Sequence, residues 1–402
     1  MRIKLVDLAA QNEEIRKRVN AAFAEIHQRS AYVGGAQVKA FEEEFAQFLG
    51  VQRVVGVSSG TDAIRLALIG LGVGPGDEVI TAPMTFIATT AAISQTGALP
   101  VFVDVDPETA NISVEAVLRY LRAGRFRTPR GPKAIVPIHL YGNPAALLEL
   151  RAVANAYGLH VVEDACQAHG ARIQTPDGWK SAGTIGAAGC FSFYPGKNLG
   201  AWGEAGAVVT NDAELAERVE ALRDHGRISH YAHQVYGYNA RLDSIQAAVL
   251  RAKLARLADW NERRRQVAAT YRKLLGGLEG LALPTEPADT QSCYHLFVVR
   301  SEKRDAIRQA LLTKRIECGL HYPVPLHLQM ACRSLGYRAG DFPVSERIAD
   351  TVLSLPMHPH LGDAEIAEVA AVVREALKEN SNMFAGRPWL NDPTFPPRNV
   401  DR

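Results

Sequence analysis

The amino-acid sequence predicts an α/β fold built on a mostly parallel sheet. From Val51 to about Thr210, short apolar runs alternate with helical stretches, which is typical of strands connected by helices that cover both faces of a sheet. The runs expected as strands read, in order, VVGV, EVIT, LPVFVDV, AIVPIHL, LHVVE, GCFSF and GAVVT. Three of them lead into polar or glycine-rich segments, and ligands bind beyond the strand ends in such sheets. We therefore expect one site that gathers these three segments.

Two helices precede the sheet. Residues 1–32 begin with a strand-like KLVDL and continue as a charged amphipathic helix to about Arg29, and we treat them as an N-terminal arm. Ala36–Leu49 is expected to be a second helix, because its apolar residues recur at spacings of three and four. The residues of this helix expected in the core are Val38, Phe41, Phe45 and Phe48.

The first polar segment runs from Ser58 to Thr61, between the apolar run VVGV and the helix-like stretch Asp62 to Gly70. Its small residues leave backbone N–H groups open at a helix N-terminus, which is a ready site for a phosphate. The alternative is an ordinary helix cap, because Ser and Thr are preferred at that position.

The second segment starts at Asp164, which directly follows the apolar run LHVVE. A carboxylate at the end of a strand is well placed to meet a ligand. The alternative is an acid that only caps the loop.

The third segment is the stretch FSFYPGKNLG, residues 191–200. Proline and glycine on both sides of Lys197 break the strand pattern, so this lysine is expected on a tight loop. An unprotonated lysine amine is a nucleophile toward carbonyls, and pyridoxal phosphate enzymes use such a lysine as a Schiff base. In those enzymes an Asp keeps the pyridine nitrogen protonated, a role that Asp164 could fill. A solvated turn lysine is the alternative for Lys197.

A long helix is expected from Asn239 to Leu275, with Asp243 and Gln246 as a capping box at its start. After a polar linker, the run YHLFVV opens a smaller α/β unit that continues to Leu377. We divide the chain into an arm (1–32), a large domain (33–250), a small domain (251–379) and a tail (380–402). The tail is rich in Pro and Asn, and the aromatic residues expected to anchor it are Phe384, Trp389 and Phe395.

Composition agrees with a soluble enzyme. The 402 residues allow two or three domains, and the formal net charge of +2 gives no general argument for a nucleic-acid or membrane partner. No signal peptide or membrane span is evident, so we expect a cytoplasmic protein. Neither a CxxC pair nor a GxGxxG, GxxxxGK[ST] or HExxH pattern is present, so we expect free thiols and no metal site. The five cysteines are Cys166, Cys190, Cys293, Cys318 and Cys332.

Seven motifs in register carry a resemblance to a known family. They read SSGTDAIRLAL, PMTFIATT, PIHLYG, VEDACQAHGA, FSFYPGKNLG, GYNARLDSIQAAVL and HYPVPLHLQ. From roughly Leu5 to Leu377, the chain resembles the DegT/DnrJ/EryC1/StrS family of sugar aminotransferases. The resemblance implies an aspartate-aminotransferase-like fold (fold type I), pyridoxal 5′-phosphate as cofactor, and a homodimer. It also implies amino transfer from L-glutamate, which leaves 2-oxoglutarate, to a keto sugar carried on a nucleotide.

The same resemblance implies a role for each matching residue. Lys197 would hold the cofactor as a Schiff base, be displaced by glutamate and then move the proton between the cofactor's C4′ and the substrate carbon. Asp164 would keep the pyridine nitrogen protonated, and Gln167 would contact the ring hydroxyl. Phe86 would stack on the ring, although it could also be a core aromatic. The residues implied at the phosphate are Gly60, Thr61, Ser192 and, from the other subunit, Asn239.

One departure from the family pattern follows the lysine. Residues 203–206 read GEAG, where relatives usually have GEGG or GDGG. Because every expected chemical contact lies elsewhere, we expect Ala205 to alter only the flexibility of the loop.

Two features bear on the substrate. Relatives that aminate 3-keto sugars tend to read RLD, as at residues 241–243, and to carry HYPxPxHLQ, as at 321–329. We therefore expect a dTDP-3-keto-6-deoxyhexose. The alternatives are a UDP-linked 3-keto N-acetyl-glucuronate and a 4-keto-6-deoxy nucleotide sugar. His321 and Tyr322 are the substrate-side candidates, unless they only shape their loop.

Three other readings of the same fold are weighed. A sugar 3-dehydratase would carry histidine in place of Lys197. A regulator would add a DNA-binding domain, and no helix-turn-helix flanks the core. A noncatalytic cofactor-binding or structural protein stays open on motifs alone.

Overall fold

A computed structural model describes residues 2–378 of the chain. The tail aromatics expected to pack on the protein lie outside the described residues. Among the described residues, no helix is long and apolar enough to cross a membrane.

Seven strands form the large sheet, in the order β1-β9-β8-β5-β4-β2-β3. Neighbours from β3 through β2, β4 and β5 to β8 are parallel, whereas β9 runs antiparallel to both β8 and β1. Each apolar run expected as a strand overlaps one of these strands, so the mostly parallel α/β sheet is confirmed. The strands are β1 (Arg53–Val57), β2 (Glu78–Thr81), β3 (Leu99–Phe102), β4 (Pro132–Ile135), β5 (His160–Asp164), β8 (Ala188–Ser192) and β9 (Gly206–Thr210).

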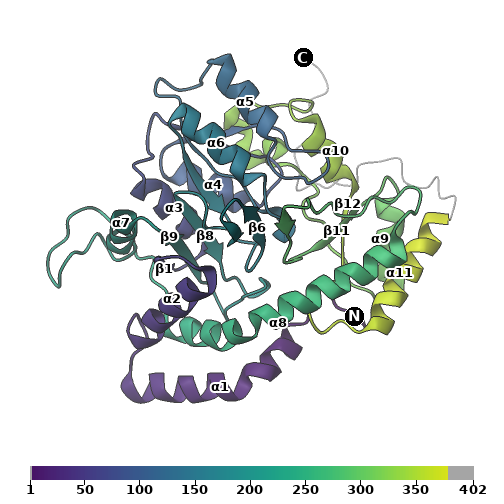
Figure 1. The fold of residues 1–402 in the computed structure, drawn as a ribbon, viewed down its shortest axis with the longest axis horizontal. Helices are drawn as coiled ribbons and strands as arrows, with labels where there is room; N and C mark the ends of the chain where they lie inside the picture. The colour runs from purple at the N-terminus through teal and green to yellow at the C-terminus, as the bar shows by residue number, and fades with distance from the viewer. Residues whose placement is uncertain (1, 379–402) are drawn as a thin grey trace.

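Successive side chains of these strands enter different cores, because they point to opposite faces of the sheet. In β1, Val54 belongs to one buried cluster and Val55 to another; in β9, Val209 and Val208 divide in the same way. Helices cover both faces (Figure 1). The cluster of Val55 also takes side chains from α3 (Gly60–Gly70), α4 (Ile87–Gln95) and α7 (Ala213–Arg223). The cluster of Val54 takes them from α2 (Ala36–Leu49), α5 (Val114–Ala123) and α6 (Leu147–Tyr157).

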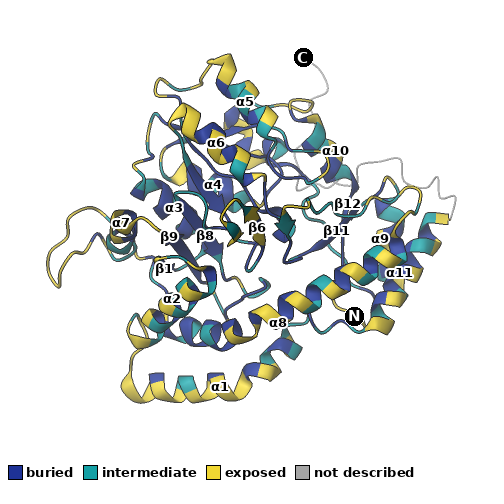
Figure 2. Cartoon of the chain, viewed as in Figure 1, coloured by how far each residue is buried: buried dark blue, intermediate teal, exposed yellow. Residues whose placement is uncertain are grey.

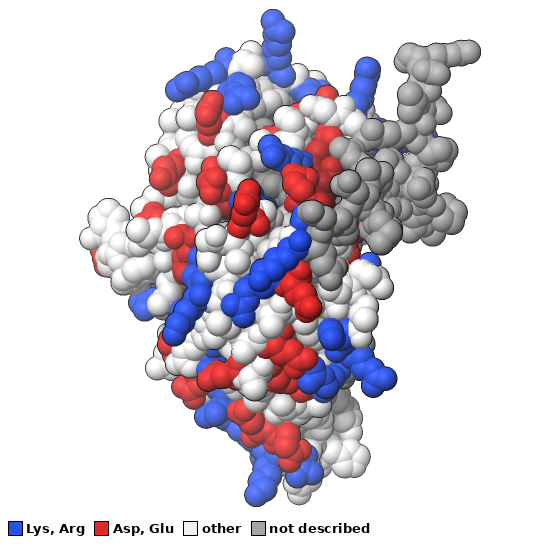
Figure 3. Space-filling view, turned by 90° about the vertical axis from the view of Figure 1, so that its right-hand side faces the viewer, with Lys and Arg blue, Asp and Glu red and all other residues white. Residues whose placement is uncertain are grey.

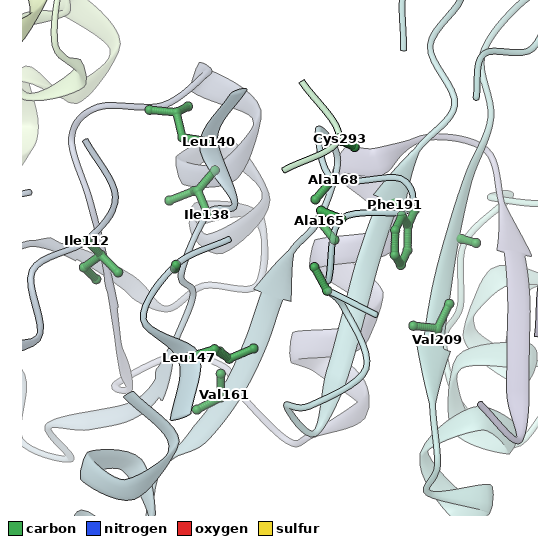
Figure 4. Close-up of a cluster of buried hydrophobic side chains, with 14 of the residues drawn as sticks. Ile112, Ile138, Leu140, Leu147, Val161, Ala165, Ala168, Phe191, Val209 and Cys293 are labelled. Carbon is green, nitrogen blue, oxygen red and sulfur yellow. The ribbon is translucent and has the colours of Figure 1, made fainter. Parts of the chain in front are cut away.

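Aromatic rings fill the second of these cores beside the third polar segment. The rings of Phe41 and Phe45 stack with centroids 5.6 Å apart, and both meet Phe193 edge to face at 5.3 and 5.4 Å. Figure 4 shows Phe191 in this cluster next to Ala165 and Ala168. The expectation that α2 presents its aromatics to the core is therefore confirmed, with Phe48 packed at the edge.

Helix α8 (Ser244–Leu275) crosses from the large sheet to the smaller unit as one continuous helix (Figure 1). Helix α1 (Leu8–Arg29) packs along it, with Ile15 and Val19 against Val249 and Trp260. The start of α8 differs from the expectation. Asn239 and Arg241 form isolated bridges rather than helix, and Asp243 caps α8 without a side-chain hydrogen bond to it.

The expected capping box is wrong because Gln246 is engaged elsewhere. Its Oε1 accepts a hydrogen bond from the backbone N–H of Trp202 at 2.9 Å. The side chain of Trp202 in turn donates to Asn12 of α1 at 2.8 Å. A contact with a distant segment has therefore replaced the local cap.

The smaller unit has its own core, formed where β11 and β12 meet the last helices. Its elements are β11 (Phe297–Arg300), α9 (Arg304–Thr313), α10 (Pro343–Thr351), β12 (Val352–Leu355) and α11 (Asp363–Lys378). A further sheet, β10-β6-β7, lies outside the expected pattern. It comprises β6 (Arg172–Thr175), β7 (Gly178–Ser181) and β10 (Thr290–Gln291), and the short 3₁₀ helices are η1 (Leu140–Gly142), η2 (Leu326–Leu328) and η3 (Met330–Leu335).

Two features concern the surface near the sheet. The segment between α7 and α8 projects from the molecule, and Figure 2 shows it as largely exposed. On the face in Figure 3, basic and acidic side chains are interspersed, in keeping with the near-neutral net charge. Away from this surface, Ala205 is fully buried, and its carbonyl accepts from the N–H of Phe193 at 2.8 Å; the expectation that it alters only loop flexibility stays a prediction.

Candidate active site

The three polar segments meet at one edge of the large sheet. Strand β1 is parallel to β8 and β5, because it pairs with β9, which reverses direction between them. Their carboxyl ends therefore share an edge. A Cβ added to Gly60 would lie 2.6 Å from Cβ of Ser192 and 2.8 Å from Sγ of Cys166. Glycine at position 60 thus lets the start of α3 approach the ends of the other two segments.

Helix α3 presents its N-terminus at this edge. The side chain of Ser59 caps the helix by accepting from the N–H of Asp62 at 3.1 Å, so the cap that was weighed as an alternative is present. The first N–H groups of a helix, here those of Gly60 and Thr61, lack partners within the helix. A cap and an anion site are compatible, since one side chain satisfies only one of these donors.

Asp164 ends β5 and is 5 % exposed. Its Oδ2 accepts from the hydroxyl of Thr89, on α4, at 2.8 Å. Its Oδ1 accepts from the N–H of Cys166 at 3.2 Å. The carboxylate therefore caps its own loop through Cys166 and is also held by Thr89 from a distant helix.

Lys197 lies on the turn after β8, where its N–H donates to the carbonyl of Tyr194 at 2.9 Å. Burial lowers the pKa of the Lys197 amine, while Cys166 and Asp164 act in the opposite direction. Burial disfavours the charged form of an amine, so the environment favours the neutral nucleophile. A freely solvated turn lysine does not fit these surroundings.

Three histidines near the lysine, one buried and two half-buried, stay neutral. Burial, with the nearby charge of Lys197 as the second cause, lowers the pKa of His169 to about 3 and that of His321 to about 4. The pKa of His295 falls well below its usual value for the same two reasons. Among these four groups, Lys197 is the amine, and burial moves its pKa downward from its usual value.

Gln167 joins the sheet edge to the smaller unit. Its Oε1 accepts from the N–H of Tyr141 at 2.6 Å, and its Nε2 donates to the hydroxyl of Tyr322 at 3.2 Å. The hydroxyl of Tyr141 donates in turn to the carbonyl of His321, whose ring meets Ser354 at 2.8 Å. Both substrate-side candidates thus lie beside the site, on the loop between α9 and η2.

Two other residues expected at the site, Phe86 and Asn239, are exposed rather than buried. Phe86 immediately precedes α4 and is 56 % exposed, so the alternative of a core aromatic is wrong; its ring lies 6.1 Å from that of Tyr322. Asn239 is exposed, and its Oδ1 accepts from Arg241 at 2.9 Å, although the adjacent carbonyl of Ala240 accepts from the N–H of Ser58.

Sequence reasoning missed four residues at the site. Thr89 reaches Asp164 from a helix 75 positions earlier, and Tyr141 meets the smaller unit. His169 and His295 come close to Lys197 only through packing. The available signal for Thr89 and His169 was that they lie inside the motifs PMTFIATT and VEDACQAHGA.

The donor set fits pyridoxal 5′-phosphate. A neutral buried amine, a carboxylate at the end of the neighbouring strand and a helix N-terminus are what the aldehyde, the ring nitrogen and the phosphate of this cofactor require. Glycine at position 60 adds a cradle that a Cβ would fill. Fold and site together define a fold-type I aminotransferase dependent on pyridoxal phosphate.

The chain belongs to the DegT/DnrJ/EryC1/StrS aminotransferase family, whose sequence pattern matches residues 13–374. It is 45 % identical to the dTDP-3-amino-3,4,6-trideoxy-alpha-D-glucose transaminase of Streptomyces venezuelae, over 93 % of this chain and 96 % of the relative. It is 43 % identical to a UDP-N-acetyl-3-dehydro-alpha-D-glucosamine 3-aminotransferase of Acidithiobacillus ferrooxidans, over 93 % and 98 % of the two chains.

The solved structures agree. The crystal structure of S. venezuelae DesV in complex with a ketimine intermediate has a TM-score of 0.89 and 44 % sequence identity, covering 94 % of this chain and 99 % of that one. The expected family, fold and cofactor are confirmed. The protein is a pyridoxal phosphate-dependent nucleotide-sugar aminotransferase.

Proposed function

We propose that this aminotransferase moves the amino group of L-glutamate to C3 of a nucleotide-linked 3-keto sugar, specifically a dTDP-3-keto-6-deoxyhexose. The observation that carries the proposal is the 45 % identity to a transaminase whose name places the amino group at C3 of a dTDP-linked deoxy sugar. The Acidithiobacillus relative is also named as a 3-aminotransferase, which supports C3 with a different carrier nucleotide.

Lys197 and Asp164 carry the chemistry in this proposal. Lys197 is the attachment point of the cofactor, and its lowered pKa supports attack by a neutral amine. When not attached to the cofactor, the same amine would be the group that moves the proton between the cofactor's C4′ and the carbon that gains or loses nitrogen. Asp164 faces the ring nitrogen and keeps it protonated. When bound, the cofactor supplies an electron sink for negative charge on that carbon.

The phosphate is held in the proposal by the N–H groups of Gly60 and Thr61 and by the hydroxyl of Ser192. The N-terminus of α3 supports this role, since helix N-termini attract anions. Phe86 stacks on the cofactor ring from its exposed position before α4. Gln167 contacts the ring hydroxyl and is already oriented by its two hydrogen bonds.

His321 and Tyr322 bind the sugar in the proposal. His321 stays neutral, because burial and the charge of Lys197 lower its pKa to about 4. Burial raises the pKa of Tyr322 to about 12, so its hydroxyl keeps its proton as a donor. Two neutral groups that can donate hydrogen bonds suit a sugar with several hydroxyl oxygens.

We place this chemistry in a homodimer, with Asn239 of one protomer reaching the phosphate site of its partner. Support comes from the projecting segment between α7 and α8. Four apolar or aromatic side chains there, namely Ile228, Tyr231, Val235 and Tyr236, are 61, 89, 49 and 102 % exposed. Exposed apolar groups gathered on one segment mark a protein interface.

The test of the substrate runs the reaction backwards. Holoenzyme is given 2-oxoglutarate with a purified dTDP-3-amino-3,6-dideoxyhexose, a UDP-linked 3-amino sugar or a dTDP-4-amino-4,6-dideoxyhexose, and glutamate is measured. We expect the largest kcat/KM with the dTDP-linked 3-amino sugar and no turnover by a Lys197→Ala control. Faster turnover of the UDP-linked sugar would show that the carrier nucleotide is UDP rather than dTDP. Turnover of the 4-amino sugar alone would contradict C3 and leave the aminotransferase class intact.

A further inference from the structure

A pair of threonine hydroxyls lies behind the Asp164 carboxylate. Thr85 is 3 % exposed and lies just before α4, and Thr89 is 1 % exposed and lies in its first turn. Their Oγ1 atoms are 3.1 Å apart, and Oγ1 of Thr89 is 2.8 Å from Oδ2 of Asp164. The two hydroxyls and the carboxylate therefore form one hydrogen-bonded row in the interior.

The direction of both hydrogen bonds follows from the carboxylate. An ionised Asp accepts hydrogen bonds but cannot donate them, so Thr89 must be the donor to Oδ2. The single proton of the Thr89 hydroxyl is then used, and its oxygen is left as the acceptor for Thr85. Each donor polarises the next, so the hydrogen bond from Thr85 to Thr89 strengthens the one from Thr89 to the carboxylate.

The surroundings explain why such a row is needed. A buried carboxylate without hydrogen bonds is costly, and its partners here are few and specific. Oδ1 has the N–H of Cys166 at 3.2 Å, whereas Oδ2 has the shorter contact from Thr89. Hydrogen bonds to a charged group are about twice as strong as neutral ones, so the loss of the Thr89 hydroxyl should be felt at the carboxylate.

We propose that Thr85 and Thr89 are positioning residues, whose hydroxyl relay, from Thr85 to Thr89 to Asp164, fixes the carboxylate so that it faces the ring nitrogen of the cofactor. This inference rests on the proposed function in one respect, namely the pairing of Asp164 with that nitrogen. The inference adds that the affinity of the enzyme for the cofactor depends on Thr85 and Thr89, which act through Asp164.

The test compares Thr89→Val with Thr90→Val. Valine keeps the shape of threonine and removes the hydroxyl. Thr90 is a matched control, because it is the next residue of α4, is 3 % exposed, and has a hydroxyl with no hydrogen-bond partner in the described part of the chain. The readouts are the dissociation constant of pyridoxal 5′-phosphate and the pH midpoint of the absorbance change of the bound cofactor.

We expect Thr89→Val to weaken cofactor binding by about tenfold and to shift the pH midpoint, since a hydrogen bond to a charged group is lost. Thr90→Val should leave both readouts unchanged, and Thr89→Ser should restore them. Thr85→Val should shift them in the same direction by less; it also serves as the test if Thr89→Val does not fold. Equal behaviour of Thr89→Val and Thr90→Val, or of Thr85→Val and Thr90→Val, would overturn the relay.

Asp164→Asn separates the relay from the proposed function. If Asp164→Asn shifts both readouts and the threonine variants do not, only the relay is wrong. If Asp164→Asn also leaves both readouts unchanged, the pairing of Asp164 with the ring nitrogen fails, and the relay fails with it.

Discussion

At the scale of single residues, the site places the Lys197 amine, whose pKa is lowered, near three neutral histidines. Burial and the charge of Lys197 lower the pKa values of His169, His295 and His321. These rings therefore do not compete for protons at neutral pH. Burial lowers the pKa of Lys197 itself. A lowered pKa makes the neutral amine more accessible, which is what a proton-carrying nucleophile requires.

Replacing this lysine should separate chemistry from folding. Lys197→Ala should lose covalent attachment of the cofactor, detected by mass after borohydride reduction, and lower amino transfer by about a thousandfold or more. Its thermal midpoint should change little, because the turn is held by a backbone hydrogen bond to Tyr194. The control is Lys180→Ala, at an exposed position of β7. Wild-type activity in Lys197→Ala would exclude it as the attachment point.

The residues found from sequence are those that follow a strand. Lys197 and Asp164 could be predicted because strand ends are readable as apolar runs broken by loop residues. Thr89 could not, because its contact with Asp164 joins positions 75 apart in the chain. His295 could not either, since its burial beside Lys197 depends on how the two units pack.

At the scale of elements, strands and amphipathic helices followed their apolar patterns. All seven runs became strands of one sheet, and the helix Ala36–Leu49 has the expected bounds. The expected start of α8 was wrong, because Asn239 and Arg241 bridge to other segments and Gln246 binds the backbone of Trp202. The hairpin of β6 and β7 was missed, since its strands lack the apolar runs used to find the others.

The segment between α7 and α8 leads to a prediction about shared sites. Lys197→Ala and Asn239→Ala should each be inactive, because one lacks the amine and the other a phosphate contact supplied across the dimer. Random exchange of subunits should restore about a quarter of wild-type activity, since half of the dimers are mixed and each has one intact site.

The measurement uses heterodimers purified through two different tags, which should show about half of wild-type activity because one of their two sites is intact. Each variant exchanged with itself is the control and should stay inactive. Heterodimers without activity would show that each site is built from a single chain.

At the scale of the whole molecule, the site lies where the sheet edge meets the smaller unit. Helix α8 connects the two as one continuous element, and it runs across the boundary that we set at residues 250 and 251. Gln167 with Tyr322, and Tyr141 with His321, join the two units beside Lys197. The sequence indicated both units, but only packing could bring their loops together. The domain boundaries stay a prediction.

The central claim is that this molecule accepts an amino group from glutamate, and half of the reaction tests it most directly. L-Glutamate is added to purified holoenzyme without any sugar, while the absorbance of the bound cofactor is recorded and 2-oxoglutarate is quantified. We predict a spectral change with 2-oxoglutarate released in proportion to active sites, reversal when excess 2-oxoglutarate is added, and neither effect in Lys197→Ala. Holoenzyme that retains its cofactor but shows no spectral change and releases no 2-oxoglutarate would contradict the account.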